Sequence, residues 1–327
     1  YVFVLPFVLT FAIFWILPIG KSVIMSTEKI LPGQIQHLGM GNYTRLIQDR
    51  VFKVAVGNSF KYMIATLILL IPIPMLLACI INAKLVGEKF QGFFKSALFI
   101  PALTSVVVAG TVFRLIFGEM DTALMNSVVG FFGIAPIKWL KNSGTGFFAL
   151  LLLACWRWFG VNMMYFLSGL QSIPGDYYEA ASIDGANTWQ KFIKITVPML
   201  KPTIVYVLTI SIYGGLAMFN ESYMLYAGNN SPNNIGLTIV GYLYRQGIEK
   251  NDMGYASAVG VVLLALVLLI NVIQLAATGT LRRRRNDTMS DMTMNIPVRK
   301  SAKKPKITAV KVLAYVFLIV LAIIILI

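Results

Sequence analysis

Residues 177–198 read YYEAASIDGANTWQKFIKITVP, a long polar and charged stretch that lies between two strongly apolar ones. Asp176 and Glu179 have the spacing of a capping box, in which two side chains bond free backbone N–H groups at the start of a helix. Gly185 predicts the end of that helix, because glycine enters the left-handed backbone conformation at little steric cost. The spacing therefore predicts a short helix that begins at Asp176 and ends at a glycine corner.

A second short helix is predicted directly after the corner. Asn187 and Gln190 repeat the capping-box spacing, and Phe192 and Ile193 give the helix an apolar side. Pro198 and Pro202 predict its end before the next apolar run, since proline lacks the N–H group that a continuing helix donates. We interpret the whole stretch as two short helices at a membrane surface. On pattern alone, an amphipathic connector with no further role also fits it.

The composition is typical of an integral membrane protein. Hydrophobic residues make up 57% of the sequence and charged residues 13%, and the mean hydropathy is +0.76, which lies outside the usual range of soluble proteins. The net charge is +15, but ten of the 28 basic residues fall between Arg282 and Lys311, next to apolar stretches. The excess of basic residues in cytoplasmic loops accounts for them, so we do not expect nucleic-acid binding.

Side chains that bind metals or act as nucleophiles are scarce. Cys79 and Cys155 lie within apolar stretches and are expected to be small buried side chains, not disulfide partners or metal ligands. His37 is the only histidine, which argues against a histidine metal site or proton relay. The sequence contains no phosphate-binding loop, no dinucleotide-binding glycine motif and no zinc-protease motif. We therefore expect no catalysis, no metal and no cofactor bound by this chain.

Six apolar runs are long enough to cross a bilayer as helices, because about 20 residues at 1.5 Å each span roughly 30 Å. They are residues 1–19, 59–83, 96–117, 146–170, 203–226 and 253–277. The predicted fold class is thus an all-α polytopic membrane protein with a core of six helices. Pro72 and Pro74 predict a kink in the second helix, where a freed carbonyl must bond neighbouring protein.

The distribution of basic residues predicts the orientation. If the connecting segments alternate between the two sides, residues 84–95, 171–202 and 282–311 lie on the side that carries more lysine and arginine. Cytoplasmic loops carry this excess. The glycine corner is therefore predicted to face the cytoplasm.

The two ends of the sequence carry further expectations. The first apolar run starts without methionine, and we expect the natural N-terminus to lie upstream. After a transmembrane domain of residues 1–280, we interpret residues 281–306 as a basic cytoplasmic linker and residues 307–327 as an additional transmembrane segment. The last segment fits the start of a second membrane protein in a fused pair, and a native seventh helix is the alternative.

The glycine corner also resembles a known family motif. Residues Glu179-Ala180-Ala181, Asp184-Gly185-Ala186, Phe192 and Pro198 match, in order and spacing, the EAA loop in permease subunits of binding-protein-dependent ABC importers. The preceding Ser172-Ile173-Pro174 and Tyr178 match the carbohydrate branch of that family, which includes the maltose and glycerol-3-phosphate permeases. The resemblance covers roughly residues 1–280.

This resemblance implies that the EAA loop acts as a coupling helix seated in a cleft of a separate ATP-binding subunit. Glu179 and Asp184 are suited to charged contacts with such a partner, whereas helix capping alone is the alternative role for Glu179. The resemblance further implies a complex in the bacterial inner membrane with a second permease, two ATP-binding subunits and an extracytoplasmic sugar-binding protein. ATP and Mg would bind to the partner subunits.

Polar residues inside the predicted helices are the candidate substrate contacts, because an ionised side chain at a helix centre costs about 2.5–3.5 kcal/mol on insertion scales. The candidates in the fourth and fifth runs are Arg157, Trp158, Asn162, Asn220, Glu221 and Tyr223. Aromatic faces stack on sugar rings and charged groups bond their hydroxyls. For Arg157 and Glu221, an intramembrane ion pair or bonds to backbone carbonyls are the alternative.

The predicted function is therefore the transmembrane permease subunit of an ATP-driven importer of mono- or oligosaccharides. ATP hydrolysis by a separate subunit would drive alternating access. The rival hypothesis is a secondary transporter or channel driven by an ion gradient, with Arg157 and Glu221 along its polar path. A membrane scaffold is disfavoured because charged residues lie inside two of the predicted helices.

Overall fold

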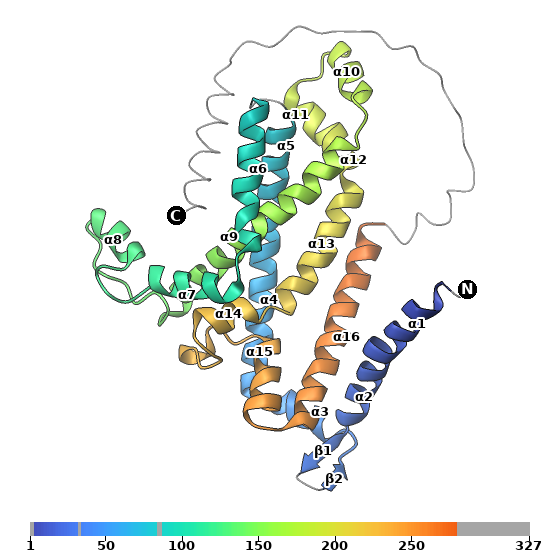
Figure 1. The fold of residues 1–327 in the computed structure, drawn as a ribbon, viewed down its shortest axis with the longest axis vertical. Coiled ribbons are helices and arrows are strands. Elements are labelled where there is room, and N and C mark those ends of the chain that lie inside the picture. The colour runs from blue at the N-terminus through green and yellow to red at the C-terminus, as the bar shows by residue number, and fades with distance from the viewer. Residues whose placement is uncertain (1–2, 32–33, 84–86, 280–327) are drawn as a thin grey trace. The chain divides into compact units, whose positions relative to one another are not determined.

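A computed structural model describes residues 3–31, 34–83 and 87–279 (Figure 1). Most of these residues are helical and the two strands form one short hairpin, so the predicted all-α class is confirmed. The predicted linker 281–306 and the segment 307–327 lie outside the described residues. The chain divides into two compact units, of which the first comprises Tyr1–Ile68, Thr104–Cys155 and Ser211–Ile270, and the second Leu69–Leu103, Trp156–Ile210 and Asn271–Ile327.

The first unit contains short helices, one hairpin and parts of four long helices. Its elements are α1 (Leu5–Phe11), a π-helical turn (Ala12–Ile16), α2 (Leu17–Met25), β1 (Glu28–Leu31), β2 (Gln34–His37), α3 (Gly41–Gln48), most of α4 (Arg50–Leu70), α7 (Val106–Ile116), α8 (Leu124–Phe131), the first part of α9 (Ser143–Gln171), the end of α13 (Lys201–Leu216), α14 (Asn220–Leu225), a 3-10 turn (Pro232–Asn234), α15 (Ile239–Tyr244), a second π-helical turn (Arg245–Glu249) and most of α16 (Met253–Ala277).

The second unit is built from the remaining helices. Besides the end of α4, the second part of α9, the start of α13 and the end of α16, its elements are α5 (Pro72–Asn82), α6 (Glu88–Leu103), α10 (Asp176–Ile183), α11 (Thr188–Lys191), a π-helical turn (Phe192–Thr196) and α12 (Val197–Met199). Its core joins α5, α6, α9 and α13 through side chains such as Leu77, Leu98, Phe166 and Val207, and Figure 1 shows α5 and α6 running side by side.

Glycine permits one close approach in this core. A Cβ atom at Gly160 on α9 would collide with the carbonyl group of Leu98 on α6. Because that obstacle is backbone and cannot rotate away, only glycine lets the two helices pack at this point.

The described residues contain four helices that are long and apolar enough to cross a membrane, or up to six if each of two bent pairs counts as one span. The four are Leu5–Met25, Arg50–Asn82, Ser143–Gln171 and Met253–Ala277. The bent pairs are Phe90–Leu103 with Val106–Ile116, at 96°, and Thr188–Met199 with Lys201–Leu216, at 65°. The six predicted runs all fall on these helices.

The third and fifth runs do not form single straight helices. The helix over the third run bends between α6 and α7, where Ser105 adopts an extended conformation shortly after Pro101. The fifth run was predicted to end at Tyr226, but α13 ends at Leu216, just after Gly214 and Gly215. Glycine has a low helix propensity, which favours an end there.

Residues 21–58, which join the first two apolar runs, do not form an irregular loop. They contain the end of α2, the hairpin, α3 and the first turns of α4. Asn42 is buried, and its side-chain amide donates to the carbonyl oxygens of Ser26 and Glu28, at 2.9 Å each. This side chain therefore ties α3 to the start of the hairpin.

A polar cluster holds α15 against the start of α4. Asp49 accepts hydrogen bonds from the hydroxyl groups of Tyr242 and Tyr255, and from the backbone N–H groups of Val51 and Phe52. Burial by itself raises the pKa of Asp49, but the hydrogen bonds together outweigh it, so the pKa lies below its ordinary value. The ionised carboxylate is thus the form that the fold stabilises.

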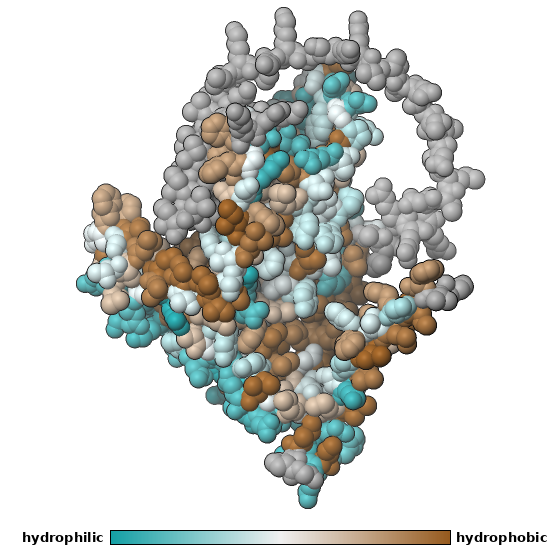
Figure 2. Space-filling view, in the orientation of Figure 1, coloured by the Kyte–Doolittle hydropathy of each residue, from teal (hydrophilic) through white to brown (hydrophobic). Residues whose placement is uncertain are grey.

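Large apolar side chains cover much of the first unit's surface. Phe7 and Trp15 are exposed on the helix of residues 5–25, and Leu268 and Leu269 are exposed on α16. Figure 2 shows this apolar surface in brown along α1 and α2. In water, exposed apolar surface on this scale would promote association. In a bilayer, the same side chains face lipid.

Candidate functional site

The first helix of the predicted EAA loop forms, but its start differs from the prediction. Helix α10 begins at Asp176 with Gly175 as its N-cap, and no side chain caps it. The predicted capping box between Asp176 and Glu179 is therefore wrong. Both carboxylates instead lie in the first helical turn, where they interact favourably with the positive end of the helix dipole.

The glycine corner forms as the sequence predicts. Gly185 has a φ of 77°, in the left-handed region. The N–H group of Gly185 bonds the carbonyl of Ser182 at 3.2 Å, and the N–H group of Ala186 bonds that of Ala181 at 2.9 Å. These two bonds are the pattern of a Schellman motif, which closes a helix end through a left-handed glycine.

The second capping box is confirmed. The side chain of Asn187 accepts from the N–H group of Gln190, and the Gln190 side chain accepts from the N–H group of Asn187, both at 2.8 Å. These two residues therefore fix the start of α11 without help from tertiary packing.

The second helix ends between the two prolines, as predicted, but Pro198 itself lies inside the helix and does not end it. A π-helical turn at Phe192–Thr196 precedes Pro198, in which the N–H group of Val197 bonds the carbonyl of Phe192 five residues earlier. Pro198 then occupies the first turn of α12, where a missing N–H group costs little. The break follows at Leu200, where α12 meets α13.

Two side-chain hydrogen bonds join the helices on either side of the corner. The hydroxyl groups of Tyr178 on α10 and buried Thr196 in the π-helical turn lie 2.9 Å apart. The ammonium group of Lys191 on α11 donates to the Ser182 hydroxyl on α10 at 2.6 Å. The corner is therefore braced as one body and does not depend on Gly185 alone.

The corner exposes apolar side chains that the sequence reasoning did not assign to the site. Ile183 is 87% exposed and Trp189 65% exposed, while Glu179, Ala180, Asp184 and Gly185 are exposed beside them. Helix α10 has no buried residue at all. A helix of eight residues without buried side chains gains little from packing, and the apolar positions on both sides of the glycine were the signal for a docking surface.

The predicted pathway residues of α9 lie in the second unit. The guanidinium carbon of Arg157 lies 5.8 Å from the centre of the Trp158 ring, a cation–π distance, and the Trp158 side chain is largely exposed. Asn162 is only 3% exposed, and its side-chain amide donates to the carbonyl oxygen of Leu70 at 2.8 Å. Asn162 therefore has a structural role, which is to bond a backbone carbonyl of α4. Its role in the sugar pathway stays a prediction.

The predicted pathway residues Asn220, Glu221 and Tyr223 lie in the first unit, on α14 and not on a continuous fifth span. Glu221 is 8% exposed, whereas Asn220 is exposed. The rings of Phe219, Tyr223 and Tyr244 all contact one another, with centre-to-centre distances of 5.1, 5.3 and 5.6 Å. Tyr244 lies at the end of α15. The sequence analysis did not identify it as a site residue, because no neighbouring motif marks it.

The described residues contain no group of three or more histidine, cysteine, aspartate or glutamate side chains that could hold a metal ion. Cys155 is buried and Cys79 half-buried, both as free thiols. The helices that are long and apolar enough to cross a membrane place the protein in the class of all-α polytopic membrane proteins.

Comparisons with known proteins identify the family within this class. Residues 2–287 match the family described as binding-protein-dependent transport system inner membrane component. The chain belongs to this family and is a permease subunit of a binding-protein-dependent importer, as the EAA resemblance predicted.

The relatives of this chain include permeases that are named for sugars. The chain is 55% identical to the arabinooligosaccharides transport system permease protein AraP of Bacillus subtilis (strain 168), over 86% of this chain and 89% of that protein. It is 46% identical to the AraP protein of Halalkalibacterium halodurans, over 86% and 88%. It is 30% identical to the lactose transport system permease protein LacF of Rhizobium radiobacter, over 85% and 93%.

The fold is shared with a solved transporter. A chain from the crystal structure of a bacterial ABC transporter involved in the import of the acidic polysaccharide alginate superimposes with a TM-score of 0.76. The match covers 88% of this chain and 96% of that chain, at 22% sequence identity.

Proposed function

We propose that this chain is one of two permease subunits of an ATP-driven oligosaccharide importer in the bacterial cytoplasmic membrane, with arabinose-containing oligosaccharides as the substrate class. The names of the relatives at 55% and 46% identity support the substrate class. The family description supports an extracytoplasmic sugar-binding protein as a partner. The complex also contains a second permease and two ATP-binding subunits, and ATP and Mg²⁺ bind to those partners.

The observation that carries the coupling role is the exposed corner. Ile183 and Trp189 lie in water on either side of Gly185, and burying an aliphatic or aromatic side chain of this size contributes about 1.5–3 kcal/mol. Glu179 and Asp184 add charged contacts on the same exposed segment. A cleft on an ATP-binding subunit that receives this segment needs an apolar floor and a basic rim.

The braced corner can transmit force. The Tyr178–Thr196 and Lys191–Ser182 hydrogen bonds make α10 and α11 move together. Helix α10 follows α9 after Gln171, and α12 leads directly into α13. A displacement of the corner by the ATP-binding subunits therefore acts on α9 and α13 at the same time, which is the movement that alternating access requires.

The candidate pathway offers the chemistry that a sugar needs. Arg157 supplies five N–H donors for hydroxyl groups, and Trp158 presents an exposed aromatic face. In the first unit, Tyr223 lies two residues after Glu221 on α14, and its ring packs against that of Tyr244 on α15, so the two side chains supply two further aromatic faces. We assign Arg157, Trp158, Asn220, Glu221 and Tyr223 to the sugar pathway, with Tyr244 added.

The coupling role is tested on the assembled complex. Trp189→Ala and Ile183→Ser should weaken attachment of the ATP-binding subunits by roughly tenfold each, since each removes one apolar contact. Leu103→Ser at the end of α6 removes an equally exposed apolar side chain and serves as the matched control. Copurification of the subunits at increasing salt gives the readout, and equal attachment in all three variants would refute the coupling surface.

The energy source and the substrate class are tested in proteoliposomes. With the binding protein and ATP enclosed, uptake of labelled arabinooligosaccharides should require the ATP-binding subunits and resist ionophores. The rival ion-gradient mechanism predicts uptake by the permeases alone, which an ionophore abolishes. Thermal-shift screening of the binding protein with arabinose, maltose and lactose oligomers identifies the sugar separately.

A further inference from the structure

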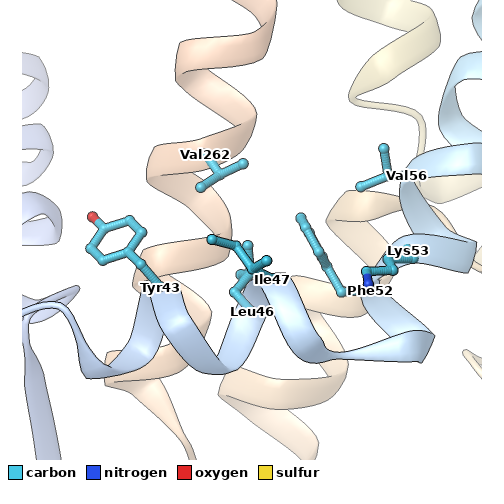
Figure 3. A pocket seen from close by; sticks show the side chains of 7 residues that line it. All are labelled: Tyr43, Leu46, Ile47, Phe52, Lys53, Val56 and Val262. Carbon is cyan, nitrogen blue, oxygen red and sulfur yellow. The ribbon is translucent and has the colours of Figure 1, made fainter.

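An apolar groove lies in the first unit between α3, the start of α4 and α16 (Figure 3). Its volume is about 420 Å³, within the range of roughly 300–1,000 Å³ that small-ligand pockets occupy. The side chains that line it are Tyr43, Leu46, Ile47, Phe52, Lys53, Val56 and Val262. The proposed transport function uses none of these residues.

The groove lies between a short amphipathic helix and two helices that are long and apolar enough to cross a membrane. Val56 and Val262 belong to helices that can cross a membrane, and Val262 lies nine residues after the start of α16 at Met253, or about 13 Å along the helix axis. Helix α3 has the pattern of an interfacial helix, because Tyr43, Leu46 and Ile47 recur on one face at helical spacing. Figure 3 shows these three side chains on the side of α3 that faces the groove.

The only charged side chain in the lining is Lys53, at one end of the groove. Its ammonium group takes no part in the Arg45–Asp252 and Lys141–Glu119 ion pairs. A lysine at the end of a transmembrane helix reaches toward the lipid headgroups. The groove thus combines an apolar channel with one cation at the height of the headgroups.

We propose that this groove binds an anionic phospholipid, with an acyl chain between α3 and α16 and the phosphate paired with Lys53. The apolar lining selects a hydrocarbon chain, and the unpaired lysine selects a negative headgroup over a zwitterionic one. Bound in this way, the lipid would fasten α3 to α4 and α16 beside the Asp49 cluster. The site is separate from the coupling corner and from the assigned sugar pathway.

The test uses the assembled transporter in nanodiscs. With Cys79 and Cys155 replaced by alanine, Gln48→Cys on α3 carries a bimane fluorophore next to the groove without lining it. Phosphatidylglycerol or phosphatidylcholine with brominated acyl chains, at equal mole fractions, serves as the quencher. We expect phosphatidylglycerol to quench about fivefold more effectively, the preference expected for one basic residue at an anionic surface.

Two charge variants and one volume variant test the assignment. Lys53→Glu should abolish the preference, whereas Lys61→Glu, an exposed lysine further along α4, should keep it. Val56→Phe fills the groove and should reduce quenching by both lipids. Equal quenching by the two lipids, no quenching by either, identical behaviour of the two lysine variants, or an unchanged signal in Val56→Phe would each overturn the proposal.

Discussion

The side-chain amide of Asn162 on α9 donates its hydrogen bond to the carbonyl oxygen of Leu70, the last residue of α4. In a continuous helix, that carbonyl would accept from the N–H group of residue 74, but residue 74 is proline. The carbonyl that the proline frees is thus satisfied from another helix, as the sequence predicted for the Pro72 and Pro74 kink.

Asn162→Leu should destabilise the protein by about 1–3 kcal/mol, because it leaves a buried carbonyl without a donor. Pro74→Ala restores the helical N–H group, so the double variant should lose clearly less stability than Asn162→Leu alone. Thermal unfolding of the four proteins in detergent gives the interaction energy. Strict additivity would contradict the backbone role and leave sugar contact as the better account of Asn162.

Gly185 should tolerate asparagine better than alanine, and alanine better than valine. The reason is the left-handed conformation, which costs an ordinary residue about 1–2 kcal/mol and asparagine less. No atom lies within 4 Å of a Cβ built at this position, so lack of space within the chain does not set the order. Sugar uptake and attachment of the ATP-binding subunits are the measurements. If asparagine and alanine abolished attachment equally, close approach of the partner would be the cause instead.

The sequence predicted the corner well because its signals are local. The Asn187–Gln190 capping box and the left-handed Gly185 depend on residues within one helical turn. Pro198 misled, because a π-helical turn shifts the hydrogen-bond register ahead of it. Such a turn depends on tertiary contacts like that of Thr196 with Tyr178, which no local pattern shows.

The arrangement of the candidate sugar-pathway residues was harder to predict, because it also depends on tertiary contacts. Hydropathy located the apolar runs but could not show where they bend, so Glu221 was placed on a span and not on the separate helix α14. The contact of Tyr244 with Tyr223 joins residues 21 positions apart in different helices. Polarity inside an apolar run identifies candidate residues, whereas their neighbours are set by packing.

Asp49 should make the stability of the protein depend on pH in the acid range. Its pKa in the folded protein is lowered, so its contribution to stability is fully present above the unfolded pKa, near 4, and is lost as the pH falls through the lower folded value. Asp49→Asn should therefore lower the melting temperature at pH 7, and its difference from wild type should shrink between pH 5 and pH 3.

The control for this measurement is Asp121→Asn, which changes an exposed carboxylate in the same unit. It should melt like the wild-type protein across the same pH range. The difference in melting temperature between the wild-type protein and Asp49→Asn could instead stay constant down to pH 3. That result would show that the hydrogen bonds from Tyr242 and Tyr255 do not depend on the charge of Asp49.

Arg157 and Glu221 should act as separate sugar contacts and not as an ion pair. Arg157→Ala removes hydrogen bonds from a charged donor, each worth about 1.5–3 kcal/mol, so sugar transported per ATP hydrolysed should fall roughly tenfold or more. Attachment of the ATP-binding subunits should stay unchanged, because Arg157 lies on α9, outside the α10–α11 corner. The charge-reversed pair Arg157→Glu with Glu221→Arg distinguishes the two roles. If the two residues contact sugar hydroxyl groups independently, the double variant should transport no better than either single variant. Restored uptake in the double variant would instead establish the ion pair. Both residues would then be removed from the sugar pathway.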